Sequence, residues 1–76
     1  MAAKTLDARH LRCPLPIMKT KRAIGTVEIG ATLEVLATDP GSPDDFTAFA
    51  EATGHALVSS EPLEDGAFRF VLRREH

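Results

Sequence analysis

Hydrophobic and polar residues follow two different periods along this chain, and the change of period divides it into predicted elements. In residues 4–9, Leu6 and Ala8 alternate with polar residues, which is the pattern of a half-buried strand. From residue 13 onward the apolar positions recur every three or four residues, which predicts a helix whose inward stripe is Ile17, Thr20, Ile24 and Val27. Proline is favoured in the first helical turn, so we expect this helix to begin at Cys13 or Pro14. Gly25 lowers helix propensity and predicts an end nearby.

The middle of the chain predicts a strand followed by a second helix. Residues 32–38 are almost continuously apolar, which indicates a central strand buried on both faces. Ser42 is a good N-cap, and acidic residues in the next turn suit a helix N-terminus. The apolar stripe of this second helix comprises Phe46, Phe49, Ala50 and Thr53, and Gly54 is well placed to end it.

The last third of the chain predicts a hairpin. Residues 56–60 form one strand, residues 64–66 carry a hairpin-turn signal, and residues 67–73 form the second strand. In the second strand Phe68, Phe70 and Leu72 would face one way. We expect residues 74–76 to be a frayed tail.

The predicted order of elements is β-α-β-α-β-β. Two amphipathic helices and four short strands predict an α+β fold, a two-layer α/β sandwich in which both helices cover one face of a four-stranded mixed sheet. We expect residues 1–76 to form a single domain, since the sequence shows no repeat or linker.

Composition narrows the classes of protein that the chain can belong to. A single cysteine excludes an internal disulfide and a cysteine-rich zinc site. The net charge of −2 argues against direct nucleic-acid binding, which favours a strongly basic domain. We find no apolar run that would act as a signal peptide or span a membrane. An unpaired thiol suits a reducing compartment, so we expect a cytoplasmic protein.

Chemistry is concentrated at Arg12-Cys13-Pro14-Leu15-Pro16, where a strand-like pattern gives way to a helical one. A thiol at a helix N-terminus lies near free N–H groups and the positive end of the helix dipole, which favours the thiolate. Pro14 and Pro16 restrict the backbone and would aim the sulfur. These features predict an exposed, activated nucleophile at Cys13. A buried, inert cysteine is the competing interpretation.

Several functions of a reactive thiol lack the necessary partners in this sequence. A cysteine hydrolase needs a base, and His10 is the nearest candidate, although a plain surface histidine is the favoured interpretation of it. His10 and Cys13 together are too few ligands for zinc, and we predict no metal site. A dithiol oxidoreductase needs a second cysteine. So small a domain also offers little pocket for a substrate. Carrying a group on sulfur, or exchanging thiols with a partner, remains open.

The stretch Leu11-Arg12-Cys13-Pro14-Leu15-Pro16 resembles the Cys-Pro-x-Pro signature of the TusA/SirA-like sulfurtransferases, a family of small sulfur-carrier proteins. The similarity extends over nearly the whole chain through residues 6–7, Met18, residues 30–33, residues 39–40 and residues 68–70. It implies a β-α-β-α-β-β sandwich similar to the C-terminal domain of translation initiation factor 3.

The resemblance also implies a function. Cys13 would accept a sulfane sulfur as a persulfide and pass it to a cysteine of another protein, in a relay rather than by stand-alone turnover. The basic residues of the first helix, Lys19, Lys21 and Arg22, would help to dock a partner. The donor would be a cysteine desulfurase or rhodanese and the acceptor a DsrE/TusD-like protein. The pathways open to the family are tRNA thiolation, molybdenum-cofactor metabolism and sulfur oxidation, and no cofactor is implied for this chain.

One position departs from the family pattern, because His10 stands where the family usually has glycine. Histidine reaches positive φ less easily than glycine, so either the loop differs or the position tolerates a side chain. We also raise the hypothesis that the imidazole tunes the sulfur.

Two further expectations concern the whole molecule. We expect a monomer, since no large apolar stripe is left on the predicted surface. The alternative function is a regulatory or protein-interaction module whose cysteine is redox-sensitive or inert.

Overall fold

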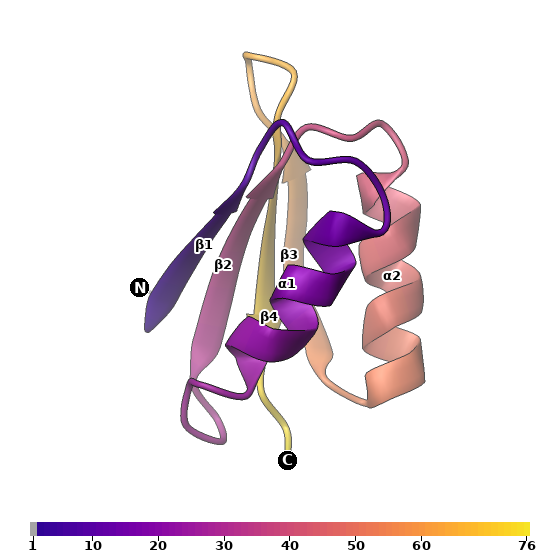
Figure 1. Cartoon of the computed structure of the whole chain (residues 1–76). Helices are drawn as coiled ribbons and strands as arrows, with labels where there is room; N and C mark the ends of the chain where they lie inside the picture. Colours follow the sequence, from indigo (N-terminus) through magenta and orange to yellow (C-terminus); the bar gives the residue numbers. More distant parts are fainter. Residues whose placement is uncertain (1) are drawn as a thin grey trace.

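The computed structural model describes residues 2–76 and contains the six elements in the predicted order. They are β1 (Lys4–Ala8), α1 (Leu15–Ile24), β2 (Thr32–Ala37), α2 (Ser42–Thr53), β3 (Ala56–Pro62) and β4 (Phe68–Arg73). The strands form one sheet in the order β1-β2-β4-β3, in which β1 and β2 are parallel and the other neighbours antiparallel. Both helices lie on the same face of this sheet (Figure 1). The predicted α+β two-layer sandwich with a mixed sheet is therefore confirmed.

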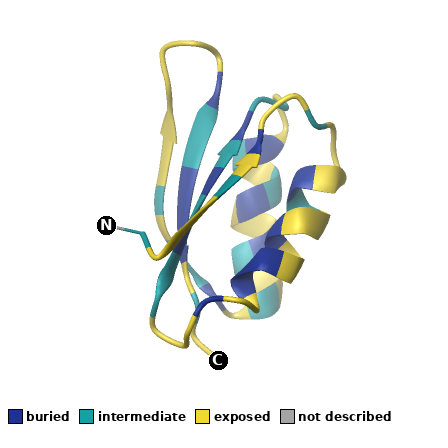
Figure 2. Ribbon diagram, turned by 60° about the vertical axis from the view of Figure 1, so that its left-hand side comes forward, coloured by how far each residue is buried: buried dark blue, intermediate teal, exposed yellow. Residues whose placement is uncertain are grey.

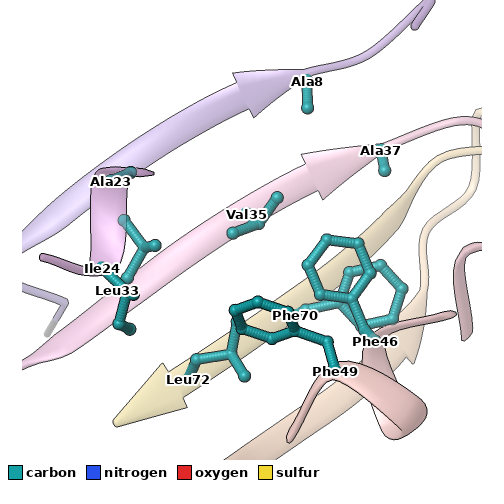
Figure 3. Close-up of a cluster of buried hydrophobic side chains, with 10 residues drawn as sticks. All are labelled: Ala8, Ala23, Ile24, Leu33, Val35, Ala37, Phe46, Phe49, Phe70 and Leu72. Carbon is teal, nitrogen blue, oxygen red and sulfur yellow. The ribbon is translucent and has the colours of Figure 1, made fainter. Parts of the chain in front are cut away.

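The core lies between the sheet and the two helices. Alternate residues of β2 point inward, and Val35 is paired in register with Phe70 of β4. The ring of Phe46 on α2 stacks on Phe70 with centroids 4.3 Å apart, and both side chains are fully buried. Figure 3 shows these rings beside the aliphatic side chains of β2 and β4. Each such side chain contributes about 1.5–3 kcal/mol when it leaves water, so this cluster holds the helices on the sheet.

The opposite face of the sheet is not covered by helices, which corrects one expectation about β2. Leu33, Val35 and Ala37 are buried, whereas the residues between them, such as Glu34, are only half-buried. Figure 2 shows this alternation along the strands. The strand is central as predicted, but burial on both faces is wrong, because both helices pack on one side.

The two helices are short, and neither of those in residues 2–76 combines the length and apolar character needed to cross a membrane. The predicted ends are partly confirmed. Gly25 follows α1 directly, and Gly54 ends α2 with φ 81°. Ser42 is not the N-cap of α2: Gly41 takes that place, and its N–H donates to the Asp39 carboxylate over 3.1 Å. The Ser42 side chain is instead buried.

The C-terminal residues are held in place, so the predicted frayed tail is wrong. The Arg74 N–H donates to the Ala31 carbonyl over 2.9 Å. The next N–H, of Glu75, donates to Nδ1 of His55 over 3.1 Å. The rings of His55 and His76 stack with centroids 4.6 Å apart. These contacts join residues far apart in sequence, which local patterns do not reveal.

Candidate functional site

Cys13 lies in the turn between β1 and α1, and its thiol is free and exposed. The peptide bond that joins it to Pro14 is cis. The turn stands at the end of the sheet where α2 also begins (Figure 1). Exposure agrees with the expectation of an accessible thiol and excludes a buried cysteine.

The N-terminus of α1 offers few N–H donors to an anion. This corrects the expectation that the helix N-terminus stabilises a Cys13 thiolate. The helix begins at Leu15, so Cys13 precedes it. Pro14 and Pro16 have no N–H, and the Leu15 N–H donates to the Arg12 carbonyl over 2.8 Å. The Met18 N–H donates to the Pro14 carbonyl over 3.0 Å. Among residues 14–18 this leaves the N–H of Ile17, so the prolines that shape the turn also remove the donors that would stabilise a thiolate.

Cys13 opens onto a groove between the two helices. The groove is open and mostly apolar, with a volume of about 490 Å³. Its α1 wall is formed by Pro14, Ile17, Met18 and Lys21, and its α2 wall by Asp45, Ala48, Phe49, Ala52 and Thr53. The sequence pattern did not indicate this groove, because both predicted helical stripes were assigned wholly to the core, whereas Ile17 and Phe49 also line the space between the helices.

The charge beside the thiol comes from α2 and is negative. A hydrogen bond to the Asp45 carboxylate raises the pKa of the Cys13 thiol above its ordinary value. Partial loss of hydration and the negative charges of Asp45 and Asp39 act in the same direction. A like charge disfavours the anionic form of a neighbouring group. These surroundings move the pKa of Cys13 upward, in the direction opposite to the predicted shift toward thiolate.

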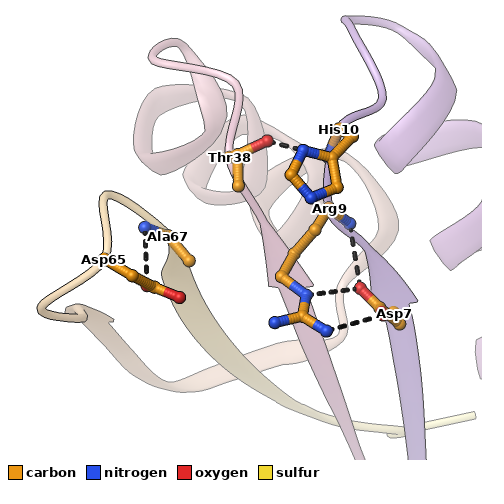
Figure 4. Close-up of polar contacts among 6 residues, drawn as sticks. All are labelled: Asp7, Arg9, His10, Thr38, Asp65 and Ala67. Atoms are coloured by element: carbon orange, nitrogen blue, oxygen red, sulfur yellow. Dashed lines mark hydrogen bonds and ion pairs between the residues drawn. The ribbon is translucent and has the colours of Figure 1, made fainter.

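His10 keeps the backbone conformation expected of the glycine that it replaces. Its φ is 68°, and its N–H donates to Oγ1 of Thr38 over 2.8 Å. Figure 4 shows this hydrogen bond beside the ion pair between Arg9 and Asp7, in which Nε of Arg9 lies 2.9 Å from Oδ1 of Asp7. The position thus tolerates a side chain without a change of loop shape.

The His10 side chain belongs to a different hollow from Cys13. Its neighbours there are Leu11, Arg12, Thr38, Asp39 and Pro40, at the carboxyl ends of β1 and β2. Arg12 is exposed there and lies one residue from the thiol. The tuning of Cys13 by His10 stays a prediction.

The three basic residues of α1 are all exposed, but they do not form one row. Lys21 lines the Cys13 groove. Lys19 and Arg22 lie toward β1, where Lys4 adds a further cation. The α1 helix carries no acidic residue, and α2 carries no basic one. The groove therefore separates a basic helix from an acidic helix.

Sequence reasoning missed Asp39 and Asp45 as neighbours of the thiol. The signal was present, because the two acids at residues 44–45 were recognised, but only as a mark of a helix start. Their proximity to Cys13 depends on how α2 packs against α1. No cluster of three potential metal ligands occurs in residues 2–76.

Known proteins resemble this chain in both sequence and fold. Residues 4–74 match the family model described as Sulfurtransferase TusA. A putative sulfur carrier protein of Neisseria meningitidis serogroup A is 44% identical over 75 residues, covering 99% of this chain and 100% of that protein. The sulfur carrier protein TusA of Allochromatium vinosum is 46% identical over 69 residues, covering 91% of this chain and 90% of that protein.

A solved structure supports the fold independently. The SirA-like protein from Desulfitobacterium hafniense superimposes with a TM-score of 0.82 at 23% identity, covering 96% of this chain and 99% of that one. At that identity the similarity concerns the architecture alone. The family model and the relatives above 40% identity identify the chain as a member of the TusA family of sulfur carrier proteins.

Proposed function

We propose that Cys13 carries a sulfane sulfur as a persulfide and passes it to a cysteine of an acceptor protein. The observation that carries this proposal is an exposed, unpaired thiol at the mouth of an interhelical groove, in a chain of the sulfur-carrier family. Cys13 is the single cysteine of the sequence, so any sulfur chemistry on cysteine falls to it.

The transfer is a pair of redox-neutral exchanges. The Cys13 sulfur loses its proton and attacks the outer sulfur of a donor persulfide. A new bond forms between that sulfur and Sγ, the donor sulfur–sulfur bond breaks, and the donor leaves as a thiolate. Unloading repeats the step, with an acceptor thiolate attacking the outer sulfur and Cys13 leaving. No external oxidant or reductant is needed.

The surroundings of Cys13 favour this chemistry over hydrolysis. A cysteine hydrolase needs a base within hydrogen-bond reach of the thiol. Among the ten residues that line the groove there is no histidine, and the group that interacts with the thiol is a carboxylate. The apolar walls suit contact with the surface of another protein.

We assign partner docking to the exposed basic residues of α1. Lys19, Lys21 and Arg22 are exposed and would steer an acidic surface by charge complementarity, which mainly raises the rate of association. A cysteine desulfurase or a rhodanese would act as donor and a DsrE/TusD-like protein as acceptor. The product pathway would be tRNA thiolation, molybdenum-cofactor metabolism or sulfur oxidation.

Intact-mass spectrometry tests the proposal. The protein is incubated with a cysteine desulfurase and cysteine, and separately with glutathione persulfide. We expect the mass of one added sulfur atom, which a reductant removes, and no increase in Cys13→Ala. Absence of the added sulfur with both donors, or its persistence in Cys13→Ala, would contradict persulfide carriage on this residue.

A further inference from the structure

Asp45 has a special place in the groove, because it is the one carboxylate among the ten residues that line it. It belongs to the first turn of α2 and is half-buried. Lys21 is the one cation of the same lining, and it lies on the opposite wall. The thiol at the mouth of the groove therefore meets an acid that comes from the other helix.

The position of Asp45 is fixed by the packing of α2. Its N–H donates to the Gly41 carbonyl over 3.0 Å, and the next residue, Phe46, is fully buried against the sheet. A Cβ placed on Gly41 would lie 3.7 Å from Oδ2 of Asp45 and 3.2 Å from Oδ2 of Asp39. Both carboxylates thus gather at the start of α2.

The charged groups around the thiol can be named from each neighbouring element. The start of α2 and the loop before it supply Asp45 and Asp39, and the α1 wall supplies Lys21. The loop after β1 supplies Arg12 and His10, whose side chains line the separate hollow. The pKa of Cys13 moves upward through Asp45, partial loss of hydration and the charge of Asp39, with no contribution from the cations.

We propose that Asp45 tunes sulfur transfer by its charge: its carboxylate lines the same groove as the Cys13 thiol and disfavours negative charge on the sulfur that Cys13 carries. The inference rests on the proposed function, since the carried charge is that of a persulfide. A persulfide ionises more readily than the parent thiol, so loading places an anion beside an existing anion. Asp45 therefore shifts the exchange toward the unloaded carrier and makes the loaded carrier a better donor.

The proton balance follows from the same arrangement. On loading, the thiol proton leaves Sγ and is released to solvent. On unloading, Cys13 departs as a thiolate beside the Asp45 carboxylate and recovers a proton from solvent. Apart from this proton, the only bonds that change are the sulfur–sulfur bonds of the donor, carrier and acceptor.

Two measurements on Asp45→Asn test the inference, with Asp44→Asn as the matched control. Asp44 is the exposed neighbour in the same turn and does not line the groove. The first measurement is the rate of alkylation by iodoacetamide against pH. We expect the midpoint to move to lower pH in Asp45→Asn and to stay unchanged in Asp44→Asn. Asp45→Glu keeps the negative charge, so its alkylation midpoint should lie close to that of the wild type.

The second measurement is a competition for sulfur. Persulfide-loaded wild-type protein labelled with ¹⁵N is mixed with an equal amount of unloaded variant, and the sulfur on each is read by intact mass, starting from either side. Asp45→Asn should hold more than half of the sulfur, whereas Asp44→Asn should share it equally.

The outcomes separate the two proposals. Coincident alkylation midpoints for wild type and a folded Asp45→Asn, or an equal sharing of sulfur, would overturn the role of Asp45 while leaving persulfide carriage intact. A shifted midpoint in a protein that never acquires sulfur would support the placement of Asp45 on the thiol and overturn persulfide carriage.

Discussion

The two helices lie side by side on one sheet, yet they present opposite chemistry at their N-termini. The α2 N-terminus follows the rule for helix ends, with acids in its first turn and the Asp39 carboxylate accepting the Gly41 N–H. The α1 N-terminus carries the thiol, but two prolines and a turn hydrogen bond leave it few donors. A helix N-terminus is therefore not by itself a thiolate site. Whether a thiolate is stabilised there depends on the available N–H groups and on the neighbouring charges.

The helices also differ in how they are held. Phe46 and Phe49 anchor α2 with aromatic contacts, and the two ring centroids lie 6.5 Å apart. The buried side of α1 consists of Pro16, Thr20, Ala23 and Ile24. Aromatic rings thus hold the acidic wall of the groove, whereas smaller side chains hold the wall that bears the reactive turn.

The largest effect should come from removing the anchor of α2. Phe46→Ala empties a fully buried site stacked on Phe70, and such a change costs about 3–5 kcal/mol. Urea unfolding followed by circular dichroism measures the loss. Val58→Ala, at a side chain that is 53% exposed, is the control and should change little. Equal stabilities of the two variants would mean that aromatic packing does not hold α2.

Removing the Thr20 hydroxyl from the buried side of α1 should stabilise the protein. Thr20 is fully buried, and its Oγ1 has no hydrogen-bond partner within residues 2–76. Thr20→Val keeps the shape and removes the unsatisfied group, so we expect a gain of about 1 kcal/mol in the free energy of unfolding.

The matched control for Thr20→Val is Thr26→Val. Its hydroxyl donates to the Ala23 carbonyl over 2.6 Å, so this change should destabilise. A loss of stability in both valine variants would show that the Thr20 hydroxyl is satisfied in solution.

The charge asymmetry at the groove mouth can be measured with two alkylating agents. At a pH where Cys13 is fully ionised, negatively charged iodoacetate should react more slowly relative to neutral iodoacetamide than it does with a free thiol. Asp45→Asn should raise the iodoacetate-to-iodoacetamide rate ratio by about two- to fivefold, as expected for one nearby charge in water. The wild-type ratio should rise toward the free-thiol value in 1 M salt, about the concentration at which charges a few ångströms apart are screened. An unchanged ratio would place the acid away from the sulfur.

The smallest effect concerns the face of the sheet that neither helix covers. Arg69 forms a short ion pair with Glu34 and, with Thr5, lowers the pKa of Glu34 below its ordinary value. A lowered folded pKa contributes stability above the unfolded value, and this is lost as the pH falls through the folded value. Glu34→Gln should therefore lose less stability than wild type between about pH 5 and about pH 3. The exposed Glu28→Gln serves as control. Parallel pH curves for wild type and Glu34→Gln would contradict the pairing.

The order of elements and most of the core were predictable from local pattern. The alternation of Phe68, Phe70 and Leu72 depends only on strand geometry, and the spacing of Thr20 and Ile24 depends only on helix geometry, whereas Val27 is buried beyond the end of α1. The Gly54 helix end was predictable for the same reason, since a left-handed residue favours glycine. The start of α2 was less predictable, because Gly41 takes the N-cap position expected for Ser42 and the Asp39 carboxylate accepts the Gly41 N–H.

By itself the sequence determined the six elements, the accessible position of Cys13 before α1, and the resemblance that led to the sulfur-carrier family. It could do so because periodicity, proline geometry and a short motif are properties of neighbouring residues. Only the tertiary structure decided the environment of the sulfur. The α2 helix brings Asp45 and Asp39 to a thiol that is distant in the chain, and the proline-rich turn leaves α1 few donors to oppose them. Electrostatic influence follows distance in space, and the packing of α1 and α2 on the sheet sets that distance.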